Sequence, residues 1–346
     1  MASVSKKNVK RTLQYLTAFI IVLGILFAFT NLKKFKNHFV SIDLTFFLVA
    51  VGCTFTVYLL EGIFTKLSLL VFDERLPLLS SLKYSFIINA FGYLVSLGGL
   101  TPFATQIYVL DHHDISPKIA TLSRVLQFIF FNILFDLLLL VGFVALLIQR
   151  EKGNIHLTAI IFAISLFFLL ITGLYLAVFW KAFQKKASTL FVRFLNRIMR
   201  IFSKKFRIEE QWAKDFLNDF NVGFFKLIKK PGYFITLFIV TVVDWCFWLG
   251  VMYFCFSAFN YHIPVDFLII GFSIGQIIGI LSMIPGGAGT MEGSMAIVFV
   301  ALGVPLETAL SAIILFRISF YILPFFLSLP LYFSLQQKHK SIEKNA

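Results

Sequence analysis

The sequence predicts an all-α, polytopic membrane protein that forms one integral membrane domain over residues 1–346. Of its residues, 59% are hydrophobic and 14% are charged, and the mean hydropathy is +0.89, whereas soluble domains carry about 25% charged residues. Several apolar runs are long enough to cross a hydrocarbon core of ~30 Å. Two of them are broken by Gly and Pro. A break in a helix at membrane depth is found only where the backbone is buried inside protein or lines a water-filled cavity. We expect about six full transmembrane helices and two re-entrant hairpins.

The first half of the chain contains five apolar runs. In order, they cover residues 13–29, 44–72, 78–110, 119–148 and 157–180. The first run follows four basic residues, but no small-residue cleavage site comes after it, so we expect an uncleaved helix. The third run is interrupted by Gly98-Gly99-Leu100-Thr101-Pro102, which leaves two pieces too short to span comfortably. We therefore predict a re-entrant hairpin there and full spans elsewhere.

The segment of residues 181–232 differs from the rest because it is strongly basic. It holds 13 Lys or Arg against 4 Asp or Glu. Apolar side chains recur at helical spacing between Leu190 and Phe202, with basic side chains on the opposite face. This pattern predicts a basic amphipathic cytoplasmic segment that lies on the membrane surface and attracts anionic phospholipid headgroups.

Three further apolar runs follow, at residues 233–258, 267–303 and 306–335. The middle run is broken by Pro285-Gly286-Gly287-Ala288-Gly289, which predicts the second hairpin. If the basic segment faces the cytoplasm, most of the Lys and Arg residues fall on that side, as the positive-inside rule requires. We therefore expect a bacterial-type cytoplasmic membrane location with both termini in the cytoplasm.

The order span, interrupted hairpin, span occurs twice, at residues 44–148 and 233–335. The paired glycines begin 54 and 53 residues into the two copies. Each copy then has an arginine within an apolar run, Arg124 in the first and Arg317 in the second. The two copies have opposite orientations, so the hairpins would enter from opposite sides and meet near the midplane, as in transporters with inverted repeats. A chance coincidence of spacings is the alternative.

Arg124 and Arg317 are the first candidate site residues. A charge within an apolar helix costs at least ~2.5 kcal/mol and persists mainly when it faces an interior with a partner. The planar guanidinium suits phosphate, so the arginines would bind the phosphodiester of a lipid headgroup. Alternatively, they lock helices together by pairing with carboxylates, for which the candidates are Glu61, Asp136, Asp244 and Glu292.

The second break supplies further candidates. Its glycines remove side chains where backbone N–H groups could approach an anion, and close helix packing of small residues is the alternative. Glu292 would receive a cationic group or a proton, and two glutamines would hold headgroup hydroxyls or bridge helices. The full set of candidate substrate-binding residues is Arg124, Arg317, Glu292, Gly286, Gly287, Gly289, Gln106, Gln276 and Asp244.

Catalysis by this chain alone is not expected. All six histidines fall in expected loops, so a membrane-embedded Ser-His or zinc-histidine site lacks its base or its ligands. The run Asp111-His112-His113-Asp114 suggests a metal, but adjacent side chains diverge, which favours a solvated helix cap. We expect no metal, no cofactor and no nucleic-acid partner.

The two interrupted runs resemble those of the lysylphosphatidylglycerol synthase transmembrane-region family. The resemblance rests on Ile284–Glu292 with Gly303-Val304-Pro305 and Arg317, and more weakly on Gly98-Gly99, Pro102, Gln106 and Arg124. Many relatives carry Glu in or near the first motif, so Gln106 is a departure. Larger members fuse this region to a soluble domain that transfers an aminoacyl group to phosphatidylglycerol, and their membrane part is assigned to lipid flipping. Only a short tail follows Leu335, so the resemblance implies the flipping half.

Two functions therefore remain open. The first is flipping of phosphatidylglycerol or its lysyl derivative, or alternatively of a polyprenyl-phosphate-linked glycan, through a polar cavity between the hairpins. The second is a membrane subunit of a lipid-modifying synthase that works with a separate aminoacyltransferase protein. A homo-oligomer is compatible with both.

Overall fold

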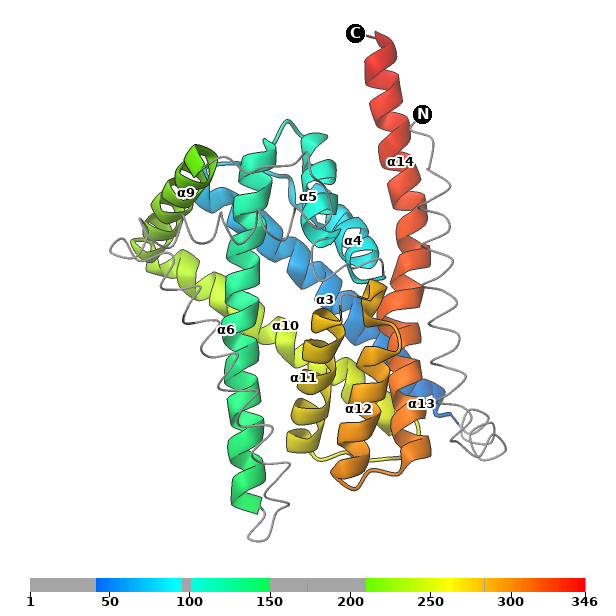
Figure 1. Cartoon of the computed structure of the whole chain (residues 1–346). Coiled ribbons are helices and arrows are strands. Elements are labelled where there is room, and N and C mark those ends of the chain that lie inside the picture. The colour runs from blue at the N-terminus through cyan, green and yellow to red at the C-terminus, as the bar shows by residue number, and fades with distance from the viewer. Residues whose placement is uncertain (1–41, 95–100, 150–172, 174–209, 283, 346) are drawn as a thin grey trace.

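The computed structural model describes residues 42–94, 101–149, 173, 210–282 and 284–345, and every regular element among them is a helix (Figure 1). The expected helices at residues 13–29 and 157–180, and the amphipathic stretch before residue 205, lie outside the described residues. The elements are α3 (Leu44–Val71), α4 (Leu78–Leu94), α5 (Thr101–Asp111), α6 (Pro117–Gln149), α9 (Glu210–Ile228), α10 (Pro231–Ser257), α11 (Val265–Leu281), the 3-10 turn η1 (Pro285–Gly287), α12 (Thr290–Ala301), α13 (Leu306–Arg317), the π-turn η2 (Ile318–Ile322) and α14 (Leu323–Asn345).

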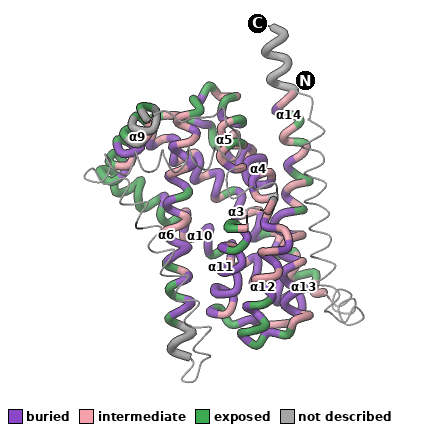
Figure 2. Tube along the Cα trace, in the orientation of Figure 1, coloured by how far each residue is buried: buried purple, intermediate pink, exposed green. Residues whose placement is uncertain are grey.

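Four stretches of the described chain are long and apolar enough to cross a membrane. They are Leu44–Val71, Pro117–Val144, Pro231–Ser257 and Leu306–Gln336. Large apolar side chains stand exposed on these helices, including Leu48, Val141, Ile239 and Phe326, and exposed residues recur along α6 and α14 (Figure 2). Exposed apolar surface of this extent is rare on soluble proteins and is expected where side chains face lipid. The chain is a multi-pass membrane protein, and the total of six spans stays a prediction.

The antiparallel pair α3 and α10 forms the centre of the fold. The start of α3 is tied to the end of α10, because the Asp43 N–H donates to the Ala258 carbonyl at 2.9 Å. The Asp43 side chain also caps α3 by accepting from the Thr45 N–H at 2.8 Å. Trp248 of α10 packs against Phe320 with 4.1 Å between ring centroids. The contact between these helices and η2 is therefore aromatic.

The two interrupted runs are divided as the sequence predicts. The helices α4 and α5 pack against each other, and α11 and α12 pack against each other with η1 between them in the chain. The α4–α5 pair lies at the end of the molecule that holds α9, and the α11–α12 pair lies at the opposite end (Figure 1). Between these two ends, α4 contacts η1. Re-entry into a membrane and the inverted repeat stay predictions.

Glycines at every fourth position let α11 and α12 approach closely. Gly271, Gly275 and Gly279 of α11 face Phe299, Met295 and Met291 of α12, in that order. A Cβ built on Gly275 would lie 2.1 Å from Met295 Cγ, and one on Gly271 would lie 2.2 Å from Phe299 Cε1. The larger side chains of α12 therefore occupy the space that the glycines leave, the close packing typical of small-residue stripes in membranes.

Replacing Gly275 with Ala should destabilise this helix pair. The added methyl overlaps the buried Met295 side chain, and overpacking of this kind costs about 1–3 kcal/mol. We expect a lower Tm in detergent for Gly275→Ala and partial recovery in Gly275→Ala/Met295→Ala, because the second change removes the overlapping atoms. Equal Tm values for wild type and Gly275→Ala would contradict this packing.

Helix α9 is tied to the spanning helices by two ion pairs. Lys118 of α6 pairs with Asp219, and Lys226 pairs with Asp73 at 2.5 Å, just past the end of α3. The Asp73 side chain is 73% exposed, and the hydrogen bond from Lys226 lowers its pKa below the ordinary value of 3.8. A depressed carboxylate pKa contributes stability above the ordinary pKa and loses that contribution as the pH falls through the native value.

The Asp73 carboxyl, followed by NMR, should therefore titrate below 3.8. In Lys226→Met the midpoint should rise toward that value, because the donor is gone. The matched control is Lys229→Met, which removes a neighbouring lysine and should leave the midpoint in place. An unchanged midpoint in Lys226→Met would contradict the pairing.

Candidate functional site

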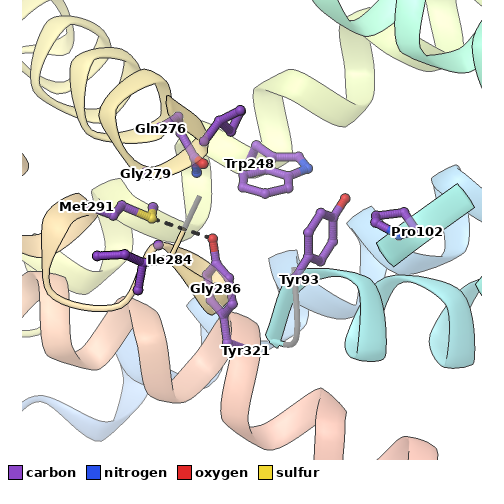
Figure 3. Close-up of a pocket in the computed structure, with 11 residues that line it drawn as sticks. Tyr93, Pro102, Trp248, Gln276, Gly279, Ile284, Gly286, Met291 and Tyr321 are labelled. Atoms are coloured by element: carbon purple, nitrogen blue, oxygen red, sulfur yellow. Dashed lines mark hydrogen bonds between the residues drawn. The ribbon is translucent and has the colours of Figure 1, made fainter. Parts of the chain in front are cut away.

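A cavity of about 130 Å³ lies between the α4–α5 pair and the α11–α12 pair (Figure 3). We call it the hairpin cavity. Tyr93 and Pro102 line it from the α4–α5 pair, and Gln276, Gly286 and Gly287 are among the residues that line it from the α11–α12 pair. Trp248, Tyr321, Met291, Gly279, Ile280 and Ile284 complete the wall. Segments from both halves of the described chain therefore enclose one space.

The glycine turn on one side of the cavity depends on backbone angles that favour glycine. Gly286, Gly287 and Gly289 have φ values of 62°, 61° and 83°. Gly287 also lies against α11, since a Cβ there would be 3.0 Å from the Gly279 Cα. The Gly287 N–H donates to the Ile284 carbonyl at 2.8 Å. Gly286 and Gly287 therefore bring bare backbone to the cavity wall, and their part in binding an anion stays a prediction.

Arg317 clamps this turn from behind. Its guanidinium donates to the Gly286 carbonyl at 2.8 Å and contacts the Gly287 carbonyl at 3.5 Å. Nε lies 2.6 Å from the Glu292 carboxylate. The same group stacks over the Tyr321 ring, with 4.3 Å between Cζ and the ring centroid. Arg317 is thus one layer behind the cavity wall, and Glu292 is its partner among the carboxylates that the sequence offers.

Glu292 fixes the start of α12. Its second carboxylate oxygen accepts from the Gly289 N–H at 2.8 Å, which completes a capping arrangement at the first turn. Only 4% of its side chain is exposed, against 13% for Arg317. The ion pair is therefore largely shielded from solvent and holds the end of α13, the glycine turn and the start of α12 together.

A second polar cluster lies between α3, α4, α6 and α10. The Glu61 carboxylate accepts from the Tyr93 hydroxyl at 2.5 Å, and the positive charge of Arg124 acts on it. Arg124 also donates to the Gln127 side chain at 2.9 Å. The charge of Glu61 in turn acts on the Asp244 carboxyl. Arg124 and Asp244 therefore share this cluster, while Arg317 and Glu292 belong to the turn.

The two glutamines lie in different places. Gln106 is buried between α5 and α6 and donates to the Ala120 carbonyl at 3.1 Å, so it bridges helices. Gln276 lines the cavity, and its Nε2 lies beside the Tyr321 hydroxyl but outside hydrogen-bonding geometry. A buried amide donor without a partner is costly, so Gln276 is the side chain best placed to donate to a guest in the cavity.

The π-turn η2 sets the position of Tyr321. Pro324 has no N–H to donate to the carbonyl one turn earlier, and the Tyr58 hydroxyl donates to that Phe320 carbonyl instead, at 3.1 Å. The Leu323 N–H reaches back to the Ile318 carbonyl, which widens the helix. Such π-turns are frequent at functional sites, and this one turns Tyr321 toward the cavity (Figure 3).

The aromatic wall made by Tyr93, Trp248 and Tyr321 was not predicted from the sequence. Tyr93 and Trp248 rings lie 5.6 Å apart by centroid, and Tyr93 and Tyr321 lie 6.1 Å apart. Aromatic residues are too common in this chain for type alone to single these out. One usable signal is the spacing Gly271, Gly275 and Gly279, which marks the face of α11 that receives α12.

Among the described residues, no group of three or more metal-ligating side chains lies together.

Comparison with known proteins places this chain in a family. Residues 15–328 match the profile described as the lysylphosphatidylglycerol synthase TM region. The chain belongs to the lysylphosphatidylglycerol synthase TM-region family. The expected resemblance is confirmed, and the hairpin cavity lies within the matched part of the family region.

Two relatives of this family show how far the likeness extends. The chain is 26% identical over 270 residues to a UPF0104 membrane protein of Methanothermobacter thermautotrophicus, covering 75% of this chain and 74% of that protein. It is 33% identical over 101 residues to a phosphatidylglycerol lysyltransferase of Staphylococcus aureus, covering 29% of this chain and 12% of that protein. The aligned part is thus a small share of the lysyltransferase.

Proposed function

We propose that this chain moves a phospholipid headgroup between leaflets through the hairpin cavity, with the acyl chains remaining in the bilayer. The single observation that carries the proposal is the cavity itself, which is enclosed by two broken helix pairs inside a multi-pass membrane protein. Broken helices that meet at depth are how transporters build substrate sites. In this proposal the two pairs are re-entrant hairpins of an inverted repeat in a bacterial-type cytoplasmic membrane.

Family membership supports the choice of lipid class. A relative that matches 29% of this chain is a phosphatidylglycerol lysyltransferase, so we take phosphatidylglycerol or its lysyl derivative as the substrate. Gln276 would donate to a headgroup oxygen, and the Gly286 and Gly287 backbone would allow the phosphate to approach. The cavity would hold only the headgroup, because a volume of about 130 Å³ has no room for acyl chains.

Arg317 would act by changing partners. In the structure it is paired with Glu292 and the two glycine carbonyls. Two oxygens of a phosphate can accept from one guanidinium, as the two oxygens of a carboxylate can, so a headgroup that reached the turn would replace Glu292. Glu292 would then be free to receive the amine of a lysyl group. Arg124, Gln106 and Asp244 stand farther back in this proposal and support the wall.

A liposome assay tests the function. Purified protein in vesicles of phosphatidylcholine with labelled phosphatidylglycerol should accelerate leaflet exchange over protein-free vesicles. Gln276→Leu should slow the exchange by tenfold or more, since loss of one hydrogen bond to a charged group costs about 1.5–3 kcal/mol. The matched control is Gln336→Leu on α14, where Gln336 bonds Tyr332, and exchange should be retained. No exchange above protein-free vesicles would refute the proposal.

A second function has one observation in its favour, the likeness to part of a lysyltransferase. In that case the chain is a membrane subunit that works with a separate aminoacyltransferase protein, as a monomer or a homo-oligomer. Removal of this chain from cells would then abolish aminoacylation of phosphatidylglycerol itself. Under the first function, synthesis would continue and the product would stay in the inner leaflet. A vesicle assay with a labelled polyprenyl-phosphate glycan tests the remaining substrate class.

A further inference from the structure

Two buried carboxyl groups lie together in the core, away from the Arg317–Glu292 pair. Glu61 is 1% exposed and Asp244 is not exposed at all. They come from the central helices α3 and α10, and the charge of Glu61 acts on Asp244. Among the described residues, Arg124 is the one cation whose charge acts on Glu61. Two neighbouring buried carboxylates cannot both stay ionised at low cost. The positive charge of Arg124 balances one of them, so the other carboxyl group is expected to carry a proton.

The hydrogen bonds distinguish the two groups. Neither oxygen of Asp244 has a hydrogen-bond partner among the described residues, so nothing stabilises its charge. Glu61 has the Tyr93 hydroxyl on one oxygen and none on the other, while Asn89 and Trp248 lie beside it outside hydrogen-bonding geometry. Asp244 is therefore the neutral member, and Glu61 is the member whose charge depends on Arg124 and Tyr93.

Tyr93 connects this pair to the hairpin cavity. Its hydroxyl donates to Glu61 at 2.5 Å, while its ring forms part of the cavity wall between Trp248 and Pro102 (Figure 3). A proton added to Glu61 removes the charge that holds this hydroxyl and the neighbouring Arg124. The ring would then be free to move, and the wall between the two helix pairs would change shape.

We propose that the Glu61–Asp244 pair is a proton-binding site whose occupancy sets the position of Tyr93 at the hairpin cavity, so that transport is coupled to protons. The inference rests on the proposed function for its transport part only. The groups that face the pair are Arg124 of α6, Tyr93 of α4 and Tyr58 of α3, with Tyr321 of η2 beside Tyr58.

A proton suits the site better than a metal cation does. The neighbours of Glu61 include a guanidinium, an indole N–H and a phenolic hydroxyl that donates, and donors of this kind repel a cation instead of ligating it. Metal ions of the hard class need several oxygen ligands. A dependence of transport on Na⁺ at constant pH, tested by replacing Na⁺ with choline, would contradict the proposal.

Infrared difference spectroscopy tests the proton without any transport. The wild type in lipid should show a protonated carboxyl band at neutral pH, and Asp244→Asn should remove it. Asp266→Asn is the matched control, because Asp266 is a buried carboxyl at the start of α11, far along the helix from the cavity. A band that survives Asp244→Asn, or that disappears in Asp266→Asn, would overturn the assignment.

Transport measured against pH tests the coupling. Exchange should fall as the pH rises, with a limiting slope of about tenfold per pH unit for one proton. Glu61→Gln should flatten the profile, and Tyr93→Phe should flatten it while leaving the carboxyl band in place. If Glu61→Gln and Tyr93→Phe both kept the wild-type dependence of exchange on pH, the coupling would be overturned. Exchange with no pH dependence would overturn the coupling but keep the proposed function. A carboxyl band without exchange would keep the proton-binding site but overturn the proposed function and, with it, the coupling.

Discussion

Arg317→Ala should cause a larger loss of stability than any other single substitution at the glycine turn. The guanidinium joins Glu292, the Gly286 and Gly287 carbonyls and the Tyr321 ring. Its removal leaves the Glu292 carboxylate, 4% exposed, with the Gly289 N–H and no counter-charge. Removing one partner of a buried pair costs about 3–5 kcal/mol. We expect a large drop in Tm measured in nanodiscs, together with loss of lipid exchange.

The double variant Arg317→Met/Glu292→Gln separates the charge from the packing. It removes both charges and keeps similar volumes, so it should be more stable than Arg317→Ala, as is found when whole buried pairs are replaced. Arg317→Lys keeps the positive charge but loses the planar guanidinium, so its stability should lie between those of the wild type and Arg317→Ala. If the double variant were less stable than Arg317→Ala, the pair would not be the source of the effect.

Gly287→Ala should be the next most damaging change, for two independent reasons. Gly287 has a φ of 61°, a region that costs an L-residue about 1–2 kcal/mol. The new Cβ would also lie 3.0 Å from the Gly279 Cα and 3.4 Å from its carbonyl carbon and oxygen. Backbone atoms cannot rotate away as a side chain can, so overpacking adds about 1–3 kcal/mol. We expect a lower Tm and a displaced turn.

Gly293→Ala is the matched control for this prediction. Gly293 lies in α12, a short distance farther along the chain, and a Cβ there would meet nothing within 4 Å. Ala is favoured over Gly inside a helix by roughly 0.5–1 kcal/mol, so the Tm should stay the same or rise. A fall in Tm for Gly293→Ala similar to that for Gly287→Ala would contradict the distinction between the two positions.

The sequence was sufficient for the breaks because Gly and Pro interrupt apolar runs that otherwise continue. It also placed the turn from Pro285 to Gly289 at a cavity, since the local pattern has few other uses at membrane depth. It did not reveal which carboxylate each arginine faces. Arg317 pairs with Glu292 and Arg124 acts on Glu61, and these partners are set by how α6, α10 and α13 pack, which residue spacing does not encode.

The cavity wall was harder to foresee for a related reason. Tyr93 and Trp248 are two of many aromatic residues in apolar helices, and they become a wall only because α4 and α10 meet beside the glycine turn. The π-turn that aims Tyr321 depends on Pro324 and on the distant Tyr58 hydroxyl. Such long-range contacts are absent from local sequence patterns, so the residues they position are found only in the structure.

A cysteine cross-link across the hairpin cavity tests whether lipid passes between the two helix pairs. Pro102→Cys and Ile280→Cys place one thiol on each helix pair, and both positions line the cavity. In a background with Cys53, Cys246 and Cys255 replaced by Ser, a short bis-maleimide should join the two thiols. We expect the linked protein to lose lipid exchange that the same vesicles support before linking. Failure of the thiols to join, or undiminished exchange after they join, would contradict a pathway between the two broken helix pairs.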